Sequence, residues 1–208
     1  MKFTIAVVVG CAAWLGAGVV RAADISPDMR DAAQKVAVTT CATCHGPQGR
    51  SFNPKFPRLA GQSASYLVAQ MKNFKSQTRG DADALGYMWG MAAPLSDDLI
   101  DALAAYYSAQ RPGNGESADP ALIAHGKEIY EQGVAAEGIP PCVSCHGPNA
   151  VGTDDFPRLA GQHVQYLLKQ LRSFQNNMRN VAVMHGVASG LQRAQMEAVA
   201  TYLQSLGP

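Results

Sequence analysis

Hydrophobic residues recur along this chain with the spacing of helices, and no sustained stretch alternates hydrophobic and polar residues as a half-buried strand does. The clearest helix follows Ser96, a residue type that caps helix N-termini, and its first turn is acidic. Its apolar residues Leu99, Leu103 and Tyr106 lie on one face. Gly and Pro residues separate the helical stretches. We therefore predict an all-α protein of short helices joined by loops.

The chain also repeats itself over nearly all residues after the first 22. The segment Cys41-Ala-Thr-Cys-His-Gly-Pro47 recurs as Cys142-Val-Ser-Cys-His-Gly-Pro148. The segment Phe56-Pro-Arg-Leu-Ala-Gly-Gln62 recurs without change at residues 156–162. Such self-similarity indicates two copies of one domain. Each copy is expected to hold a helix before the cysteines, a loop through the Phe-Pro-Arg-Leu segment, a middle helix and a C-terminal helix.

A stretch between the two copies, residues 111–120, is rich in Gly, Pro and small polar residues that do not sustain a helix. This composition is typical of a linker. We place the N-terminal domain at residues 23–112 and the C-terminal domain at residues 113–208. The internal repeat predicts that the two domains form a pseudo-two-fold pair.

The first 22 residues have the pattern of an export signal. Lys2 precedes an apolar stretch at residues 3–20, and Val20-Arg-Ala22 offers small or aliphatic residues where cleavage needs them. We expect cleavage after Ala22 and a periplasmic location. The alternative is an uncleaved membrane anchor, because an apolar run of this length reaches the lower limit for a bilayer span. Loose membrane association therefore stays open.

The charge of the chain gives no indication of a nucleic-acid partner. The whole chain has 17 basic and 16 acidic side chains, and removal of residues 1–22 leaves 15 basic and 16 acidic ones. No basic patch indicates a nucleic-acid partner.

The two Cys-x-x-Cys-His segments carry the main chemical signal. Two thiols at this spacing can form thioethers with the vinyl groups of haem, and the adjacent imidazole reaches the iron. A redox disulfide and a zinc site are the alternatives, but neither explains a histidine after both pairs. The segments therefore predict two covalently bound haem c groups. Their expected attachment and proximal ligand residues are Cys41, Cys44 and His45 in the first copy, and Cys142, Cys145 and His146 in the second.

The second ligand of each iron is expected to be a methionine, whose soft thioether is typical of high-potential cytochromes. Met88 and Met184 both lie seven residues before a leucine that precedes the last helix of each repeat. Met91 falls opposite a valine in the same alignment. His185 is the rival ligand in the second copy, although a tryptophan stands at its position in the first. The repeat therefore selects Met88 and Met184.

With these motifs the chain resembles the dihaem cytochrome c4 family, in which two class I cytochrome c domains stand in tandem. The resemblance covers essentially residues 23–208. It implies that the carbonyl of Pro57 accepts a hydrogen bond from His45, and that Pro157 does the same for His146, which would fix each ring.

The resemblance further implies that the first and last helices of each domain cross, with a small residue against an aromatic one. Gly126 and Tyr202 fit this pattern in the second copy. The first copy has no such glycine, so Ala33 or Ala37 must face Tyr106. Arg58 and Arg158 are either partners of haem propionates or solvated loop residues.

Histidine and methionine on both irons leave no open coordination position, so the expected function is one-electron transfer by a carrier and not an enzyme. The resemblance implies redox protein partners: a quinol-oxidising complex as electron donor and a terminal oxidase as acceptor. The alternative is an electron-accepting cytochrome subunit of a dehydrogenase complex. A dihaem peroxidase is a further alternative, and it requires an iron that loses its sixth ligand.

Overall fold

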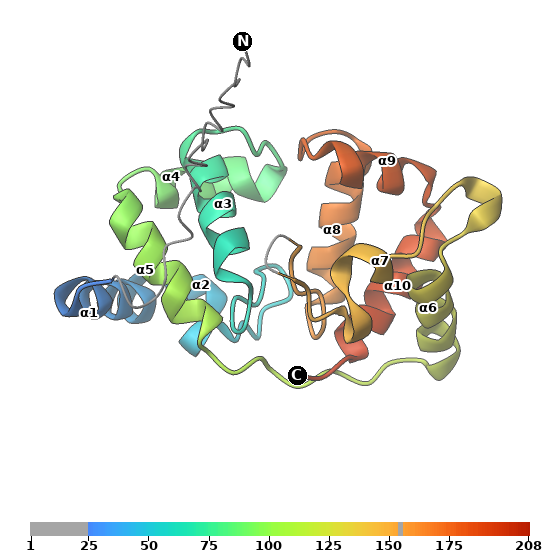
Figure 1. Cartoon of the computed structure of the whole chain (residues 1–208), viewed down its shortest axis with the longest axis horizontal. Coiled ribbons are helices and arrows are strands. Elements are labelled where there is room, and N and C mark those ends of the chain that lie inside the picture. The colour runs from blue at the N-terminus through green and yellow to red at the C-terminus, as the bar shows by residue number, and fades with distance from the viewer. Residues whose placement is uncertain (1–24, 154–155) are drawn as a thin grey trace, which may run out of the picture.

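The computed structural model describes residues 25–153 and 156–208, which form two lobes of helices side by side (Figure 1). The N-terminal lobe contains α1 (Pro27–Val36), α2 (Ala42–His45), α3 (Ala64–Lys75), α4 (Trp89–Ala92) and α5 (Asp97–Ser108). The C-terminal lobe contains α6 (Pro120–Gln132), α7 (Val143–His146), α8 (Val164–Gln175), α9 (Ala182–Gly190) and α10 (Arg193–Ser205). The predicted all-α fold with two repeated domains is confirmed. The expected signal segment, residues 1–22, lies outside the described residues.

Shorter helical turns complete each lobe. Two π-helical turns, Ala37–Cys41 and Ala84–Met88, precede α2 and α4. Three 3₁₀ turns cover Pro47–Gly49, Ala135–Glu137 and Pro148–Ala150. Within the described ranges, no helix is long and apolar enough to cross a membrane.

The linker runs along one edge of both lobes (Figure 1). It carries no helix between the end of α5 and Pro120, and the Asp119 side chain accepts a hydrogen bond from the Ala121 N–H at 2.8 Å to cap α6. The Glu116 N–H donates to the Gln204 carbonyl at 3.1 Å, so the linker is attached to the C-terminal lobe. The chosen boundary between residues 112 and 113 stays a prediction.

The first and last helices of the C-terminal lobe cross at Gly126. A Cβ at this position would lie 2.0 Å from the Ala198 carbonyl oxygen and 2.8 Å from the Tyr202 Cβ, so only glycine permits this approach. The predicted contact of Gly126 with Tyr202 is confirmed. It joins α6 and α10 into the core of this lobe, around buried Tyr130 and Met196.

In the N-terminal lobe, alanines stand where the first and last helices cross. Ala33 and Ala37 are both buried in a cluster that contains Tyr107, and Tyr106 packs against the edge of this cluster. Tyr107 is the more deeply buried aromatic of α5, and Tyr106, the residue expected to face the alanines, packs against the same cluster. Both alanines serve as the small residues, because the methyl side chain is the smallest that replaces glycine.

The start of the last helix also differs between the lobes. Ser96 caps α5 as predicted, since its Oγ accepts a hydrogen bond from the Leu99 N–H at 3.2 Å. At α10 the Gln195 side chain accepts from the Gln192 N–H at 2.7 Å. Here a side chain of the first helical turn accepts from the backbone N–H of the N-cap residue, as in a capping box.

The two lobes pack as the predicted pseudo-two-fold pair around Arg79 and Arg179, which form an antiparallel backbone bridge. The Gln70 Oε1 accepts from both guanidinium groups at 2.8 Å. The Gln170 Oε1 likewise accepts from Arg79 at 2.9 Å and from Arg179 at 2.8 Å. One feature that breaks this symmetry is a buried ion pair of Asp81 with Arg79 at 2.7 Å, since a valine stands two residues after Arg179.

Candidate functional site

Each Cys-x-x-Cys-His segment forms a single helical turn that ends at its histidine. In the N-terminal lobe the turn ends at Gly46, whose φ of 73° lies in the left-handed region that glycine adopts readily. Gly147 has the same role in the second lobe, with φ of 75°. Both histidine side chains are buried. His45 and His146 are 8% and 7% exposed.

Both histidines are oriented by a backbone carbonyl. The His45 Nδ1 donates to the Pro57 carbonyl oxygen at 2.9 Å, and the His146 Nδ1 donates to the Pro157 carbonyl oxygen at 3.1 Å. The hydrogen bonds implied by the resemblance are therefore confirmed. Because Nδ1 carries the proton, Nε2 keeps its lone pair for a metal ion. Burial also lowers the pKa of both imidazoles, which favours the neutral ring that a metal requires.

The loop that supplies the proline carbonyl is attached at both ends. In the N-terminal lobe, the Leu59 N–H donates to the Gly49 carbonyl at 2.8 Å and the Gly61 N–H donates to the Tyr107 carbonyl at 2.9 Å. The second lobe repeats this arrangement with the carbonyls of Ala150 and Leu203, at 2.9 and 2.8 Å. The identical Phe-Pro-Arg-Leu-Ala-Gly-Gln sequences thus form identical loops, each held between the cysteine turn and the last helix.

Aromatic contacts connect this loop with the methionine segment of the N-terminal lobe. The Phe56 ring lies edge-on to the His45 ring at 6.3 Å and to the Tyr87 ring at 5.9 Å. Tyr87 directly precedes Met88, so three sequence segments meet at one place. In the second lobe, Phe156 lies 6.1 Å from the His146 ring.

The candidate methionine ligands have a similar degree of burial. Met88 and Met184 are both half-buried, and Met88 packs against the cluster of Phe74, Ala84 and Ala92. Met91, the methionine that the repeat alignment did not select, is 42% exposed and does not belong to the core. The Nδ1 of His185 donates to the Phe174 carbonyl at 2.8 Å, which ties this histidine to α8.

The donor set of each lobe fits a covalently bound haem. Cys41, Cys44, Cys142 and Cys145 are free of disulfides. Burial raises the pKa of the Cys41 thiol, and it raises that of Cys142 to about 11. Two thiols, one oriented neutral imidazole and one thioether are the groups that c-type haem requires.

The structure also brings together residues whose roles the sequence analysis missed. Arg58 forms an ion pair with Glu116 and donates to the Gly161 carbonyl, so the alternative of a solvated loop arginine does not hold for this residue. His163, which lacks a counterpart in the first repeat, is buried between the lobes. Arg58 recurs in the second repeat and His163 does not, but neither fact indicated the interface. A repeat alignment does not show which side chains face the partner domain.

Comparison with known proteins identifies the family. The Cytochrome c family matches residues 31–109 and 123–207. Over 200 residues, the chain is 40% identical to cytochrome c4 from Stutzerimonas stutzeri, covering 91% of this chain and 94% of that protein. This chain belongs to the cytochrome c4 family.

Structural similarity agrees with this. The cytochrome c4 structure from Acidithiobacillus ferrooxidans has a TM-score of 0.76 and 43% sequence identity, and the match covers 80% of this chain and 98% of that one. A protein described as a thiosulfate dehydrogenase electron acceptor, from Thiomonas intermedia, is 38% identical over 187 residues, or 85% of this chain and 84% of that protein.

As a cytochrome c4, the chain is a dihaem electron carrier and not an enzyme. Its two haem c groups belong to the Cys-x-x-Cys motifs at Cys41 and Cys44, and at Cys142 and Cys145. The sequence-based predictions of family, cofactor and carrier function are confirmed. The electron donor and acceptor belong to the proposal that follows.

Proposed function

We propose that this cytochrome c4 relays single electrons in the periplasm from a quinol-oxidising complex to a terminal oxidase. The proposed iron ligands are His45 and Met88 in the N-terminal domain, and His146 and Met184 in the C-terminal domain. Haem iron supplies the one-electron exchange between Fe(II) and Fe(III). The observation that carries this proposal is the pair of buried histidines, each held by a proline carbonyl with Nε2 left as the metal-binding nitrogen.

The protein orients the histidine rings and keeps other ligands, such as oxygen and peroxide, from the irons. The carbonyls of Pro57 and Pro157 fix the tautomer and the ring direction of their histidines. The thioethers of Met88 and Met184 would be the second protein ligands of the two irons, and a fully ligated iron would not bind oxygen or peroxide. Matched placement of Met88 and Met184 in the two repeats supports the same ligand set in both domains.

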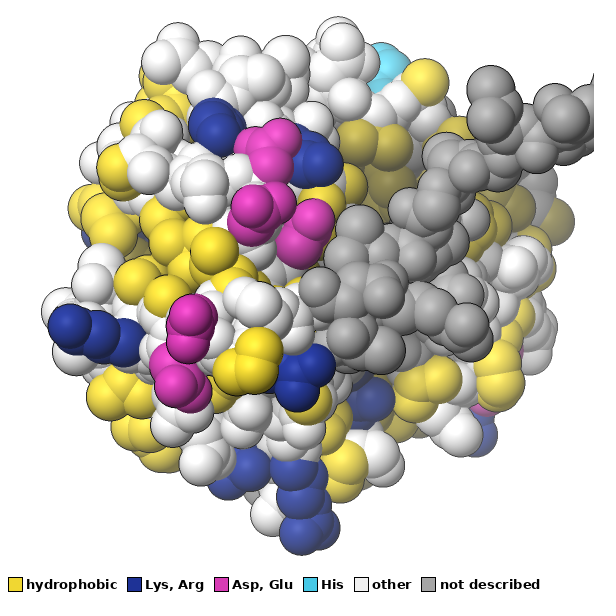
Figure 2. Space-filling view, turned by 60° about the vertical axis from the view of Figure 1, so that its left-hand side comes forward, with side chains coloured by type: hydrophobic (Ala, Val, Ile, Leu, Met, Phe, Trp, Pro, Cys, Tyr) yellow, Lys and Arg dark blue, Asp and Glu magenta, His cyan; other side chains and the backbone are white. Residues whose placement is uncertain are grey.

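The surface supports transient docking of redox partners. On the face in Figure 2, basic and acidic side chains lie next to one another and are interspersed with hydrophobic ones. Carriers that exchange partners rapidly use small, partly polar interfaces of this kind, whose affinity falls with salt.

Kinetic reconstitution tests the direction of electron flow. The reduced holoprotein should be reoxidised by membranes that contain an active terminal oxidase, and the oxidised form should be reduced by membranes supplied with quinol. Both rates should fall as salt rises. Reduction without any reoxidation by oxidase-containing membranes would contradict the proposed acceptor.

A dehydrogenase complex is the second candidate, and the similarity to the thiosulfate dehydrogenase electron acceptor supports it. Co-purification at high salt distinguishes the two. A permanent subunit stays with its dehydrogenase, whereas a transient carrier elutes alone. A stable complex at high salt would favour the second candidate.

Processing and domain limits complete the proposal. We place signal cleavage after Ala22 and the domain boundary between Pro112 and Gly113, within the helix-free linker. Mass spectrometry of the exported protein should give a chain that begins at Ala23, and retention of residues 1–22 would indicate an anchor instead.

A further inference from the structure

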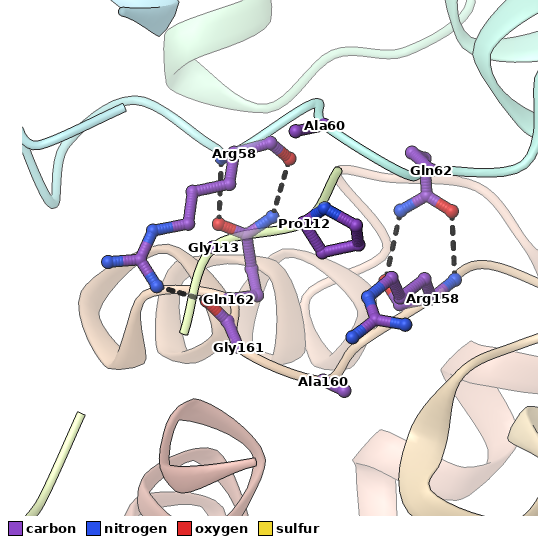
Figure 3. A pocket seen from close by; sticks show the side chains of 9 residues that line it. All are labelled: Arg58, Ala60, Gln62, Pro112, Gly113, Arg158, Ala160, Gly161 and Gln162. Carbon is purple, nitrogen blue, oxygen red and sulfur yellow. Dashed lines mark hydrogen bonds between the residues drawn. The ribbon is translucent and has the colours of Figure 1, made fainter. Parts of the chain in front are cut away.

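Gln62 and Gln162 form a reciprocal pair of contacts across the domain interface (Figure 3). The Gln162 Oε1 accepts from the Arg58 backbone N–H at 2.9 Å, and the Gln162 Nε2 donates to the Arg58 carbonyl at 2.9 Å. The Gln62 side chain makes the same two bonds to the Arg158 backbone, at 2.8 and 2.9 Å. Both glutamines are 7% exposed. Each therefore binds the backbone of the other domain in a dry environment.

The atom that each glutamine binds is part of the peptide group that orients a haem-ligating histidine. The Arg58 N–H and the Pro57 C=O belong to a single amide. This amide accepts from His45 Nδ1 at its oxygen and donates to Gln162 Oε1 at its nitrogen. The amide between Pro157 and Arg158 likewise accepts from His146 and donates to Gln62.

Hydrogen bonds at the two ends of one amide strengthen each other. Donation by the N–H moves electron density towards the carbonyl oxygen, which then becomes a better acceptor. A better acceptor draws the imidazole proton more strongly and raises the basicity of the opposite nitrogen. A more basic ligand stabilises Fe(III) relative to Fe(II), so the reduction potential of that iron falls.

Both glutamines are themselves held in place. The Gln162 Oε1 also accepts from the His163 N–H at 3.1 Å, and the Gln62 Oε1 accepts from the Ser63 N–H at 2.9 Å. Each amide side chain is thus fixed by the first residue after it in its own domain. Its orientation towards the other domain does not depend on a flexible surface loop.

We propose that Gln62 and Gln162 are positioning residues that act across the interface, each strengthening the hydrogen bond of the axial histidine in the opposite domain. Gln162 lowers the reduction potential of the N-terminal haem through His45, and Gln62 lowers that of the C-terminal haem through His146. Domain docking and haem potential are thereby coupled in both directions. The inference rests on the proposed assignment of both histidines as iron ligands.

The test compares Gln162→Met and Gln62→Met holoproteins, which keep the side-chain length but lose both hydrogen bonds. Redox titration should show a higher potential of the N-terminal haem in the first variant and of the C-terminal haem in the second. Proton–nitrogen NMR spectra of labelled histidine should show a weaker Nδ1–H hydrogen bond at His45 and at His146, respectively. Shifts confined to the domain that carries the substitution, or no shift, would overturn the proposal.

Gln70→Met is the matched control, because it removes interface hydrogen bonds to Arg79 and Arg179 without touching either proline loop. It should leave both histidine Nδ1–H signals unchanged. If it reproduced the changes of Gln162→Met, general loosening of the interface would explain them and the proposal would fail.

Gln162→Glu keeps the side-chain shape and separates the two hydrogen bonds of Gln162, acceptance from the Arg58 N–H and donation to the Arg58 carbonyl. Its carboxylate still accepts from the Arg58 N–H but does not donate to the Arg58 carbonyl, so the His45 Nδ1–H bond should stay strong. Weakening as large as in Gln162→Met would overturn the proposed route through the amide. The wild-type spectrum tests the underlying function separately, since absence of haem-induced shifts at His45 and His146 would refute the ligand assignment whatever the glutamine variants do.

Discussion

The Nε2 of His163 donates a hydrogen bond of 2.9 Å to the carbonyl oxygen of Ser51, which lies 112 residues earlier in the other domain. Both residues are buried, and the Ser51 hydroxyl donates to the Asn53 carbonyl at 3.0 Å, with the Cys44 carbonyl 3.4 Å away. A histidine of the C-terminal domain is thus joined to the loop that follows the first haem attachment motif. This contact gives the interface a titratable group.

Acid is expected to weaken the association of the two domains through His163. Burial, together with the nearby charge of Arg58, lowers the pKa of this imidazole below its ordinary value of 6.5. Below pH 6.5 the unfolded chain therefore binds a proton more readily than the folded one, and stability falls as the pH decreases. Above that pH the contribution of His163 is complete.

The measurement is the free energy of unfolding of the wild type and of His163→Gln between about pH 7.5 and pH 5. The wild type should lose more stability over this range than the variant, whose side chain does not titrate. Glu116, His125 and His185 are present in both proteins, so the difference isolates His163. Equal slopes would show that His163 is not the titrating group.

Substitution of each proposed methionine ligand should remove one Fe–S bond. Met88→Ala and Met184→Ala are each expected to halve the weak long-wavelength absorption that reports bonding between Fe(III) and methionine. Both haems should stay covalently attached, because the thioethers come from cysteine. Absorption spectra and the mass of the denatured chain check both statements.

Met91→Ala is the control for this pair, since Met91 is exposed and falls opposite a valine in the repeat. It should keep the full absorption. Loss of the band in Met91→Ala, with Met88→Ala unaffected, would show that the repeat alignment chose the wrong residue.

The buried ion pair at the interface should be far more important for stability than an exposed one. Asp81→Asn leaves the Arg79 charge buried without its carboxylate, which costs about 3–5 kcal/mol in comparable pairs. Asp97→Asn removes the exposed partner of Lys75 and should leave stability nearly unchanged. Urea unfolding of the two variants compares them directly, and equal effects would argue against a structural role for the Arg79 pair.

The helix crossing of the C-terminal domain should not tolerate a methyl group. Gly126→Ala places a Cβ against the Ala198 carbonyl, and the required shift of α6 should cost about 1–3 kcal/mol. Gly113→Ala is the control, because an added Cβ there meets no atom within 4 Å. Thermal unfolding should show a lower transition temperature for the first variant only.

Local sequence signals were sufficient for the first, middle and last helix of each repeat, the haem motifs and the Gly126–Tyr202 crossing, but not for α4 and α9. These features depend on residues close in sequence or on a pattern present twice. The domain interface was not predicted, because the contacts of Gln62, Gln162 and His163 join residues about a hundred positions apart. The exact recurrence of Gln62 and Gln162 after the proline loops was the one available signal, and nothing in a single sequence says that such a pair exchanges hydrogen bonds between domains.

The same reasoning explains why the position of Arg58 was not foreseen. Arg58 stands in a loop whose sequence suggests exposure, but the partner domain and the linker residue Glu116 cover it.

The most direct test of a two-haem carrier with histidine and methionine on each iron is the carbon monoxide difference spectrum of the fully reduced holoprotein. Carbon monoxide binds ferrous haem only where a coordination position is open or easily vacated. We predict no spectral change at either haem, because the proposed ligands Met88 and Met184 would leave no coordination position open. A carbon monoxide complex at either haem would contradict the account and would favour a peroxidase-like iron that loses its sixth ligand.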